Sequence, residues 1–337
     1  MKLTEGKQRG LKALSTERGI IAALAIDQRS ALRKLFAAAT GRPTDEIPRE
    51  WLAEYKTHAS KVLTPYASAI LLDPEYGLPA AASRDSRAGL LLAYEKTGYE
   101  KSVPGRLPST LDGFSVSRLK LAGADAVKVL LYYSPFTAAE INAKKSDWVR
   151  RVSEECIAED VAFFLEIVCY HDEMDEKGPE FARIKPDVVV QSVEEFCKAQ
   201  YAVDVIKIGV PVNIKFVQSE KVTKEQALYT RDEAVRHFRR ASDACSLPFI
   251  YLSEGVSNEL FGEALDLATA AGSAFSGVLC GRATWQDGVE VFVKHGSDAL
   301  DAWLREQGVR NIQNVNARLA SAHPWYQRAG LSRERTA

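Results

Sequence analysis

The chain has 337 residues, of which 46% are hydrophobic and 26% are charged, the balance of a globular protein with ample material for a large core. Its 44 lysines and arginines against 45 aspartates and glutamates give a formal net charge of -1, which excludes a broadly basic surface for nucleic acid or an anionic membrane. Because the apolar runs fall far short of the roughly 20 residues of a membrane span and the charged N-terminus lacks the apolar segment of a secretory signal, we expect a cytoplasmic protein.

Eight short runs rich in Val, Ile, Leu and Ala follow one another, each succeeded by a polar loop and a longer segment with helical periodicity. The expected strands are residues 19–26, 69–72, 89–94, 126–132, 162–168, 204–210, 248–252 and 276–279. Between residues 20 and 276 the interval averages about 37 residues, which suits one strand, one helix and two loops. Most runs are apolar throughout, as strands covered on both faces should be, so the pattern predicts an α/β fold, a single (β/α)8 TIM barrel. A two-domain, doubly wound arrangement is the alternative, although no Ser/Gly/Pro-rich linker divides the chain.

We expect one domain over residues 1–337, with an N-terminal extension at residues 1–18 and a frayed tail at residues 326–337. Residues 30–39 have the pattern of a helix, and Ser257 is expected to cap another helix that ends near Gly272. Longer insertions follow the first strand, at residues 40–55, and the third strand, at residues 95–112. Since the loops after the strands form the active face of this fold, the second insertion is a candidate substrate lid or, alternatively, a plain surface loop.

Two lysines and one glutamate interrupt apolar strands. Lys128 lies in ADAVKVLLYY, Glu166 in FFLEIVCY and Lys207 in VDVIKIGVPV. Burial disfavours an ammonium group, and a neutral amine is the nucleophile that forms a Schiff base with a ketone. A single buried charge is often a structural ion pair, but three together indicate a functional site, because perturbed groups cluster there. In the sixth strand the small Gly209 shares the face of Lys207 and leaves room for a substrate.

The first two strands end in acids, Asp27 in AIDQRS and Asp73 in LLDPEYG. A carboxylate at the carboxyl end of a barrel strand lies where catalysis occurs in this fold, although it can equally cap a helix or brace a loop. Gln28 adds an amide, and Arg29 adds a guanidinium able to bind a phosphate or carboxylate in fork geometry. We therefore predict a polyhydroxylated, anionic substrate.

The last two strands run into loops with glycines, a serine and an arginine. Ser253 and Gly255 follow the seventh strand, and Gly281 and Arg282 follow the eighth. Free backbone N–H groups, a hydroxyl and a cation at these two loops are typical of the recurrent phosphate site of barrel enzymes. Glu254 counts against this interpretation, because a carboxylate beside a phosphate must point away.

Metal binding is not predicted. The histidines show no HxH or HExxH spacing, and the five cysteines are widely separated, as expected for reduced residues of a core.

In their order and spacing, eight segments of the chain carry a family resemblance. They are LAIDQR, LTPYASAILLDPEYGL, GLLLAYEKTGY, AGADAVKVLLYY, FFLEIVCY, DVIKIGVPVN, YLSEGVS and GVLCGRATW. From about residue 10 to about residue 325 the chain resembles the class I tagatose 1,6-bisphosphate aldolases and, more distantly, the sulfofructose phosphate aldolases.

The resemblance implies a (β/α)8 enzyme of lactose and galactose catabolism that needs no metal or other cofactor. It would cleave D-tagatose 1,6-bisphosphate to dihydroxyacetone phosphate and glyceraldehyde 3-phosphate. Lys207 matches the family's Schiff-base lysine and Glu166 its proton-transferring acid. Further matches are to residues that contact substrate: Asp27, Gln28, Lys128, Ser253, Gly281 and Arg282.

Two positions depart from the family pattern. Relatives commonly show Lys-Val-Glu-Val-Pro where this chain has Gly209 in place of the glutamate, and Ser-Ala-Gly where it has Ser253-Glu254-Gly255. One carboxylate is lost and another is gained. These changes leave open a related ketose 1-phosphate or sulfofructose 1-phosphate as substrate. A non-catalytic, regulatory sugar-phosphate-binding barrel, a metal-dependent aldolase and an epimerase remain alternatives, and a homo-oligomer is possible.

Overall fold

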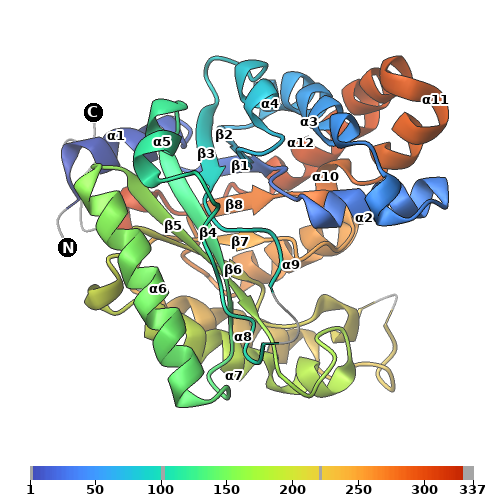
Figure 1. Cartoon of the computed structure of the whole chain (residues 1–337). Coiled ribbons are helices and arrows are strands. Elements are labelled where there is room, and N and C mark those ends of the chain that lie inside the picture. The colour runs from blue at the N-terminus through green and yellow to red at the C-terminus, as the bar shows by residue number, and fades with distance from the viewer. Residues whose placement is uncertain (1–2, 100–102, 220–221, 329–337) are drawn as a thin grey trace.

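Eight parallel strands close into a barrel in this computed structural model, which describes residues 3–99, 103–219 and 222–328 (Figure 1). Each strand pairs with the next in the chain, and β8 closes the barrel against β1. The strands are β1 (Ile21–Ala25), β2 (Ala69–Leu72), β3 (Gly89–Ala93), β4 (Ala126–Tyr133), β5 (Ala162–Cys169), β6 (Val205–Gly209), β7 (Phe249–Leu252) and β8 (Gly277–Cys280). The predicted (β/α)8 barrel is confirmed, and the limits of each predicted strand lie within two residues of those observed.

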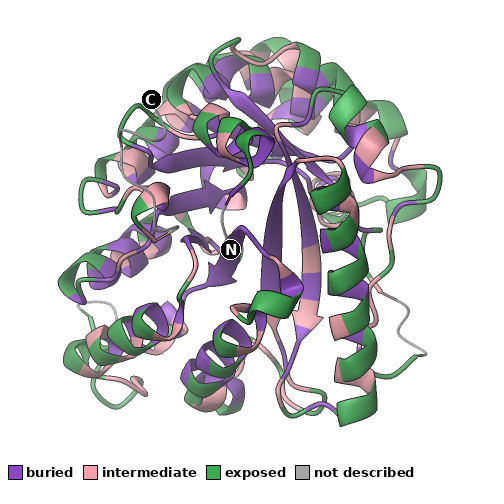
Figure 2. Ribbon diagram, turned by 90° about the vertical axis from the view of Figure 1, so that its left-hand side faces the viewer, coloured by how far each residue is buried: buried purple, intermediate pink, exposed green. Residues whose placement is uncertain are grey.

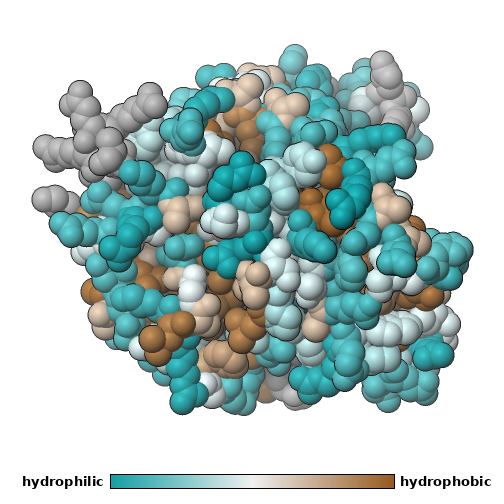
Figure 3. Space-filling view, turned by 90° about the horizontal axis from the view of Figure 1, so that it is seen from above, coloured by the Kyte–Doolittle hydropathy of each residue, from teal (hydrophilic) through white to brown (hydrophobic). Residues whose placement is uncertain are grey.

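Helices surround the barrel, with their buried faces toward the strands and their exposed faces outward (Figure 2). They are α1 (Glu5–Ala13), α2 (Ser30–Thr40), α3 (Arg49–Leu63), α4 (Leu78–Ala82), α5 (Val116–Leu121), α6 (Ala139–Ala158), α7 (Pro179–Phe196), α8 (Arg231–Ala244), α9 (Asn258–Ala270), α10 (Arg282–Trp285), α11 (Gly288–Trp303), α12 (Val309–Ala317) and α13 (Trp325–Arg328). On the face drawn in Figure 3, hydrophilic side chains predominate and hydrophobic ones lie in small groups between them, as the outer faces of amphipathic helices require.

Local signals in the sequence explain where several helices begin and end. The helix expected at residues 30–39 is α2, which stops at Gly41, a left-handed residue with φ of 70°. The Ser257 hydroxyl accepts a hydrogen bond from the Leu260 N–H at the start of α9, as predicted, and the helix ends just before Gly272. The insertion expected at residues 40–55 is only partly a loop, because its last residues form the first turns of α3.

The strands carry two apolar layers, which is why their sequences are apolar throughout. One set of side chains packs inside the barrel and includes Ala23, Leu71, Phe164 and Val205. The alternate set packs against the surrounding helices in a second, larger cluster. Since side chains alternate along a strand, Glu166 shares the inward face of Phe164, and Lys207 shares the inward face of Val205.

The N-terminal segment closes the bottom of the barrel. Lys7 bonds to Asp204 at 2.8 Å, and both side chains are almost fully buried. Gly10 lies so close to the backbone of Asp125, just before β4, that a Cβ would stand 2.2 Å from its carbonyl oxygen. Leu11 belongs to the inner cluster. Residues 5–13 are thus packed against the strand starts and are not a loose extension.

The end of the chain is ordered further than expected. Trp325 is 1% exposed, and the helix α13 continues through Arg328. The Arg328 guanidinium lies 5.1 Å from the centre of the Phe249 ring and donates to the carbonyl oxygen of Ser242 at 3.1 Å. The prediction of fraying is therefore wrong for residues 326–328, because these contacts hold them against α8 and β7. The rest of the predicted tail, residues 329–337, lies outside the described residues, as do residues 100–102 of the predicted lid.

Among the described residues, no helix has both the length and the apolar character needed to span a membrane.

Candidate active site

Lys128 on β4 is the centre of a buried ionic cluster inside the barrel. Its ammonium lies 2.9 Å from Asp27 Oδ2, 2.9 Å from Glu95 Oε1 and 2.7 Å from Glu166 Oε2. The side chain is fully buried. An ammonium has three N–H donors, and here it donates hydrogen bonds to Asp27 and Glu95 and forms an ion pair with Glu166. Lys128 is therefore a saturated cation.

Lys207 on β6 lies beside the same cluster but is far less engaged. Its Nζ lies 2.9 Å from Glu166 Oε2, the oxygen that also bonds Lys128, and Glu166 stands directly opposite Lys207 in the β5–β6 ladder. Within the described residues, the Lys207 amine donates a hydrogen bond to Glu166 Oε2. Among the described residues, Lys207 therefore keeps N–H donors that no carboxylate occupies, which Lys128 does not. This asymmetry distinguishes the two buried lysines.

The charges of the cluster shift its titrations in opposite directions. Burial alone would raise the pKa of Asp27 and of Glu166, but Lys128 and Lys207 outweigh burial and hold both pKa values below their ordinary range. Burial wins at Glu95, where the pKa is raised despite Lys128 and Arg29. The site thus offers carboxylates with their pKa values pushed apart, the pattern of an acid and a base.

Burial and the neighbouring carboxylates act in opposite directions on the pKa of Lys128. Burial lowers it, but Asp27, Glu166 and Glu95 together raise the pKa of Lys128 well above its ordinary value. Lys128 stays an ammonium, so it supplies fixed positive charge and not a nucleophile.

Glu95 belongs to the cluster, although the sequence analysis did not select it. It follows β3 by two residues, and its side chain is 8% exposed. The sequence does contain a signal for Glu95. Like Asp27 and Asp73, it is an acid just after the end of a barrel strand, here β3. Glu95 is also the first residue of the predicted insertion at residues 95–112, which is why it was not predicted as a site residue.

Asp27 and Gln28, after β1, border the cluster with unsatisfied polar atoms. Among the residues described, Asp27 Oδ1, Gln28 Oε1 and Glu95 Oε2 are buried and have no hydrogen-bond partner in the protein. Buried polar atoms are normally paired, because an unpaired one costs about 1–3 kcal/mol. These three acceptors suit hydroxyl groups of a bound sugar.

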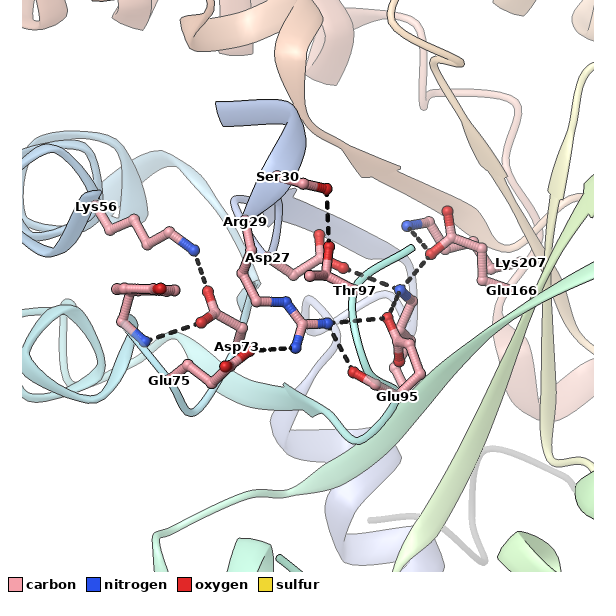
Figure 4. A network of polar contacts seen from close by, with 12 residues as sticks. Asp27, Arg29, Ser30, Lys56, Asp73, Glu75, Glu95, Thr97, Glu166 and Lys207 are labelled. Carbon is pink, nitrogen blue, oxygen red and sulfur yellow. Dashed lines mark hydrogen bonds and ion pairs between the residues drawn. The ribbon is translucent and has the colours of Figure 1, made fainter. Parts of the chain in front are cut away.

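Arg29 and Asp73 are held by contacts with the neighbouring loops, and Arg29 also pairs with Glu95 of the cluster at 3.8 Å (Figure 4). The Arg29 guanidinium donates to Glu75 at 2.7 Å and to the Glu95 carbonyl at 2.7 Å, and the residue is 5% exposed. Asp73 is fully buried, pairs with Lys56 and accepts a hydrogen bond from the Tyr76 N–H at 2.9 Å. The contacts observed for these two residues brace the loops after β1, β2 and β3, and a contact with substrate stays a prediction for both.

The loops after β7 and β8 meet as predicted for an anion site. At Gly255, with φ of 76°, a Cβ would stand 2.5 Å from Cζ of Arg282, so the loop backbone lies directly against the guanidinium. At Gly281 a Cβ would stand 3.2 Å from Nε2 of Gln28. Burial raises the pKa of the neighbouring Cys280 thiol to about 12, against a hydrogen bond from Ser253 that lowers it. The structure thus brings Ser253, Gly255, Gly281, Arg282 and Gln28 to one edge of the barrel mouth.

The two departures from the family pattern, Gly209 and Glu254, are in contact. A Cβ at Gly209 would stand 2.1 Å from Oε1 of Glu254, and Glu254 Oε2 lies 2.5 Å from Nζ of Lys185 on α7. Glu254 therefore fills the space that a side chain at position 209 would take. Its carboxylate pairs with Lys185, so the negative charge in this loop has a lysine partner.

No group of three or more His, Cys, Asp or Glu side chains in the described part of the chain is arranged to hold a metal ion. A cavity of about 820 Å³ lies at the opposite end of the barrel, between the start of β1 and α12. Its lining includes Arg18, Tyr66, Arg87 and Asn316, and none of the predicted site residues.

Residues 21–287 match the family model described as DeoC/LacD family aldolase. The chain is 50% identical over 332 residues to tagatose 1,6-diphosphate aldolase 2 of Enterococcus faecalis (strain ATCC 700802 / V583), with 98% of both chains covered. It is 46% identical over 330 residues to tagatose 1,6-diphosphate aldolase of Staphylococcus aureus (strain MSSA476), with 97% of this chain and 100% of the relative covered.

Solved structures share the barrel. A fructose-bisphosphate aldolase from Plasmodium falciparum superposes with a TM-score of 0.68 at 16% identity, covering 96% of this chain and 97% of the other. A Schiff base forming fructose-1,6-bisphosphate aldolase gives 0.55 at 15% identity, covering 92% of this chain and 98% of the other. At such identities the likeness establishes the fold alone.

Proposed function

The chain belongs to the DeoC/LacD aldolase family, and we propose that it is a class I aldolase acting on D-tagatose 1,6-bisphosphate. The products are dihydroxyacetone phosphate and glyceraldehyde 3-phosphate. The relatives named tagatose 1,6-diphosphate aldolase, at 46% to 50% identity over nearly the whole chain, support this substrate. One observation carries the assignment of the nucleophile: Lys128 is saturated by three carboxylates, whereas Lys207, 2.9 Å from Glu166, is not.

Catalysis begins with proton transfer from the Lys207 ammonium to the Glu166 carboxylate. The neutral amine attacks the ketose carbonyl at C2, protonated Glu166 gives its proton to the carbonyl oxygen, and the Glu166 carboxylate then takes a proton from the nitrogen, which yields the carbinolamine. Glu166 then donates a proton to the departing hydroxyl, which leaves as water, and the lone pair of nitrogen forms the iminium. Glu166 lies on the strand next to Lys207 and within 2.9 Å, the reach that a general acid–base group requires.

The iminium is the electron sink for cleavage of the bond between C3 and C4. The C4 hydroxyl loses its proton to a carboxylate, its oxygen forms the aldehyde, and the bonding electrons pass through C3 into an enamine. Protonation at C3 and hydrolysis of the imine then release dihydroxyacetone phosphate and regenerate Lys207. The fixed ammonium of Lys128, kept charged by its carboxylates, offsets negative charge beside the reacting carbons.

Arg282 and the loop at Ser253 and Gly255 bind the C1 phosphate in this proposal. A guanidinium pairs well with phosphate oxygens, and the loops after the last two strands are the usual phosphate site of this fold. Asp27 and Gln28, with unpaired acceptors facing the cluster, bind sugar hydroxyls. The substrate is a small phosphorylated sugar handled in the cytoplasm, and the proposal involves no nucleic acid or membrane partner. Assembly into a homo-oligomer is compatible with it.

Borohydride trapping tests the proposal. Reduction in the presence of dihydroxyacetone phosphate is expected to add a stable mass to the peptide that contains Lys207, with loss of aldolase activity. Lys207→Ala should form no adduct and release no triose phosphate. Lys7→Met, which alters a buried, paired lysine at the other end of the barrel, is the control and should still form the adduct. Turnover without an adduct, or an adduct that persists in Lys207→Ala, contradicts the assignment.

A further inference from the structure

Glu254 adopts a backbone conformation that its side chain disfavours. Its φ is 49°, in the left-handed region where residues with a Cβ are strained. It lies between Ser253 and Gly255, the two residues of the β7 loop assigned to the phosphate. Such strain persists only where surrounding contacts hold it in place, so the contacts of Glu254 show what the loop requires.

Two contacts hold the Glu254 side chain. Oε2 lies 2.5 Å from Nζ of Lys185, whose side chain is only 6% exposed and comes from α7. Oε1 lies over Gly209, at 2.1 Å from the position of a Cβ. Gly209 is the inward position that follows Lys207 on β6, so the carboxylate spans the mouth of the barrel from β7 to α7 across the end of β6. The Glu254 side chain is 32% exposed, so the ion pair is shielded from water on the lysine side and partly open on the carboxylate side.

The backbone conformation of Glu254 sets the position of the next residue, Gly255. Gly255 is the next residue and also has a positive φ, of 76°. Its α-carbon packs so closely on Arg282 that an added Cβ would stand 2.5–2.8 Å from three guanidinium atoms. A change in direction at residue 254 therefore moves the backbone that faces Arg282.

We propose that the Lys185–Glu254 ion pair is a positioning device that fixes the Ser253–Gly255 loop against Arg282 and so sets the affinity for the phosphate on C1 of the ketose. In this proposal Glu254 does not contact the phosphate, because its carboxylate is bound to Lys185 and lies over Gly209. The inference rests on the proposed function and adds to it a pair of residues outside the reacting groups. Its expected signature is a change in KM with little change in kcat.

The test begins with single substitutions assayed on D-tagatose 1,6-bisphosphate. Glu254→Ala and Lys185→Met should each raise KM about tenfold and change kcat less than about twofold, because binding of the phosphate weakens while the reacting groups stay in place. The KM of the double variant should not exceed the higher KM of the two single variants, because either change breaks the same ion pair. Glu254→Gln retains the length and an oxygen acceptor for Lys185, so it should recover much of the lost affinity.

Substitution of Gly209 provides a second, independent test of the inference. Gly209→Ala places a methyl group where Glu254 Oε1 lies, so it should raise KM in the parent enzyme. In a Glu254→Ala background the same methyl group meets free space, and Gly209→Ala should add nothing. The matched control is Asp187→Asn, which breaks another ion pair of α7, the 2.6 Å contact to Arg240, and should leave KM unchanged.

Failure of this inference is separable from failure of the proposed function. If the parent protein gives no borohydride adduct and no triose phosphate, the function itself is wrong. If the parent is active but Glu254→Ala keeps the parental KM, or loses kcat at constant KM, the positioning role is overturned. An effect of Gly209→Ala that persists without Glu254 overturns it as well. Thermal unfolding of each variant identifies any change in KM that merely follows global destabilisation.

Discussion

Glu166 Oε2 lies 2.9 Å from Nζ of Lys207 and accepts a hydrogen bond from it across the β5–β6 ladder. The same oxygen lies 2.7 Å from Lys128, which also binds Asp27 and Glu95. One carboxylate thus connects the lysine that carries fixed charge to the lysine that is free to react. The chemistry and the electrostatics of the site depend on this shared oxygen.

Glu166→Gln should therefore lose turnover before it loses substrate binding. Glutamine preserves the shape of the side chain but cannot take up or return a proton, and general acid–base catalysis contributes about 10²–10⁴-fold in rate. We expect kcat to fall by about that factor, with KM changed only a few-fold. Steady-state kinetics checks this, with circular dichroism to verify folding. A kcat close to that of the parent protein would assign the proton transfers to another group.

Lys128→Met should reverse the pH dependence of stability contributed by the cluster. In the parent protein Asp27 and Glu166 have lowered pKa values, so the folded state binds fewer protons than the unfolded state and their contribution falls as the pH falls. Without Lys128, three buried carboxylates face one another and their pKa values rise above those of the unfolded chain. The variant should lose about 3–5 kcal/mol of unfolding free energy at neutral pH, as for a broken buried pair, and recover part of it toward pH 5.

Urea unfolding of the parent protein and of Lys128→Met at several pH values between 3 and 8 measures this reversal, because the contribution of Asp27 and Glu166 in the parent is lost only below about pH 5. Lys294→Met is the control, because it removes a cation from an exposed pair with Glu290 and should leave the pH dependence of the parent protein unchanged. Parallel pH profiles for the parent and Lys128→Met would mean that Lys128 does not hold the carboxylates ionised.

Asp73→Asn should reduce stability and spare catalysis. Asp73 and Lys56 are both fully buried, and burial lowers the pKa of Lys56 even though Asp73 opposes it. Asparagine leaves the amine without its counter-charge, at an expected cost of about 3 kcal/mol or more in unfolding free energy. Below the unfolding transition kcat/KM should stay within about threefold of the parent value, because bracing and not substrate contact is lost. A hundredfold loss of kcat/KM at unchanged stability would restore Asp73 as a substrate ligand.

Arg282→Met should weaken binding of phosphorylated ketoses. A hydrogen bond to a charged group is worth about 1.5–3 kcal/mol, which corresponds to about 10–150-fold in KM. The effect should largely disappear for ketoses without a phosphate on C1. Comparing KM for D-tagatose 1,6-bisphosphate with that for the 6-phosphate alone separates the two cases, and equal losses on both substrates would place the phosphate elsewhere.

Treatment with EDTA should leave turnover intact. The proposed steps use an iminium on Lys207 as the electron sink and require no Lewis acid. The measurement is the initial rate after dialysis against chelator, compared with the rate after adding back zinc or magnesium. A loss that a divalent metal restores would support the metal-dependent alternative.

The sequence was sufficient to predict the barrel and the burial of the proposed reacting pair, Glu166 and Lys207, inside it. Eight apolar runs at regular intervals predict strands covered on both faces, and the alternation of side chains places Glu166 and Lys207 on the inward face. A lysine and a glutamate inside apolar strands are conspicuous because burying a charge is costly. The loops after β7 and β8 were equally accessible to prediction, since their glycines, serine and arginine occupy the usual phosphate site of the fold.

Only the tertiary structure decided which charged groups are already paired. Lys128 and Lys207 look alike in sequence, yet one meets three carboxylates and the other meets one. Asp73 resembles Asp27 as an acid at a strand end, but Asp73 forms its ion pair with Lys56, from a helix that precedes it in the chain. A sequence pattern reports the burial and the spacing of a residue along one element. The partner that satisfies its charge comes from another element, and closure of the barrel determines which one.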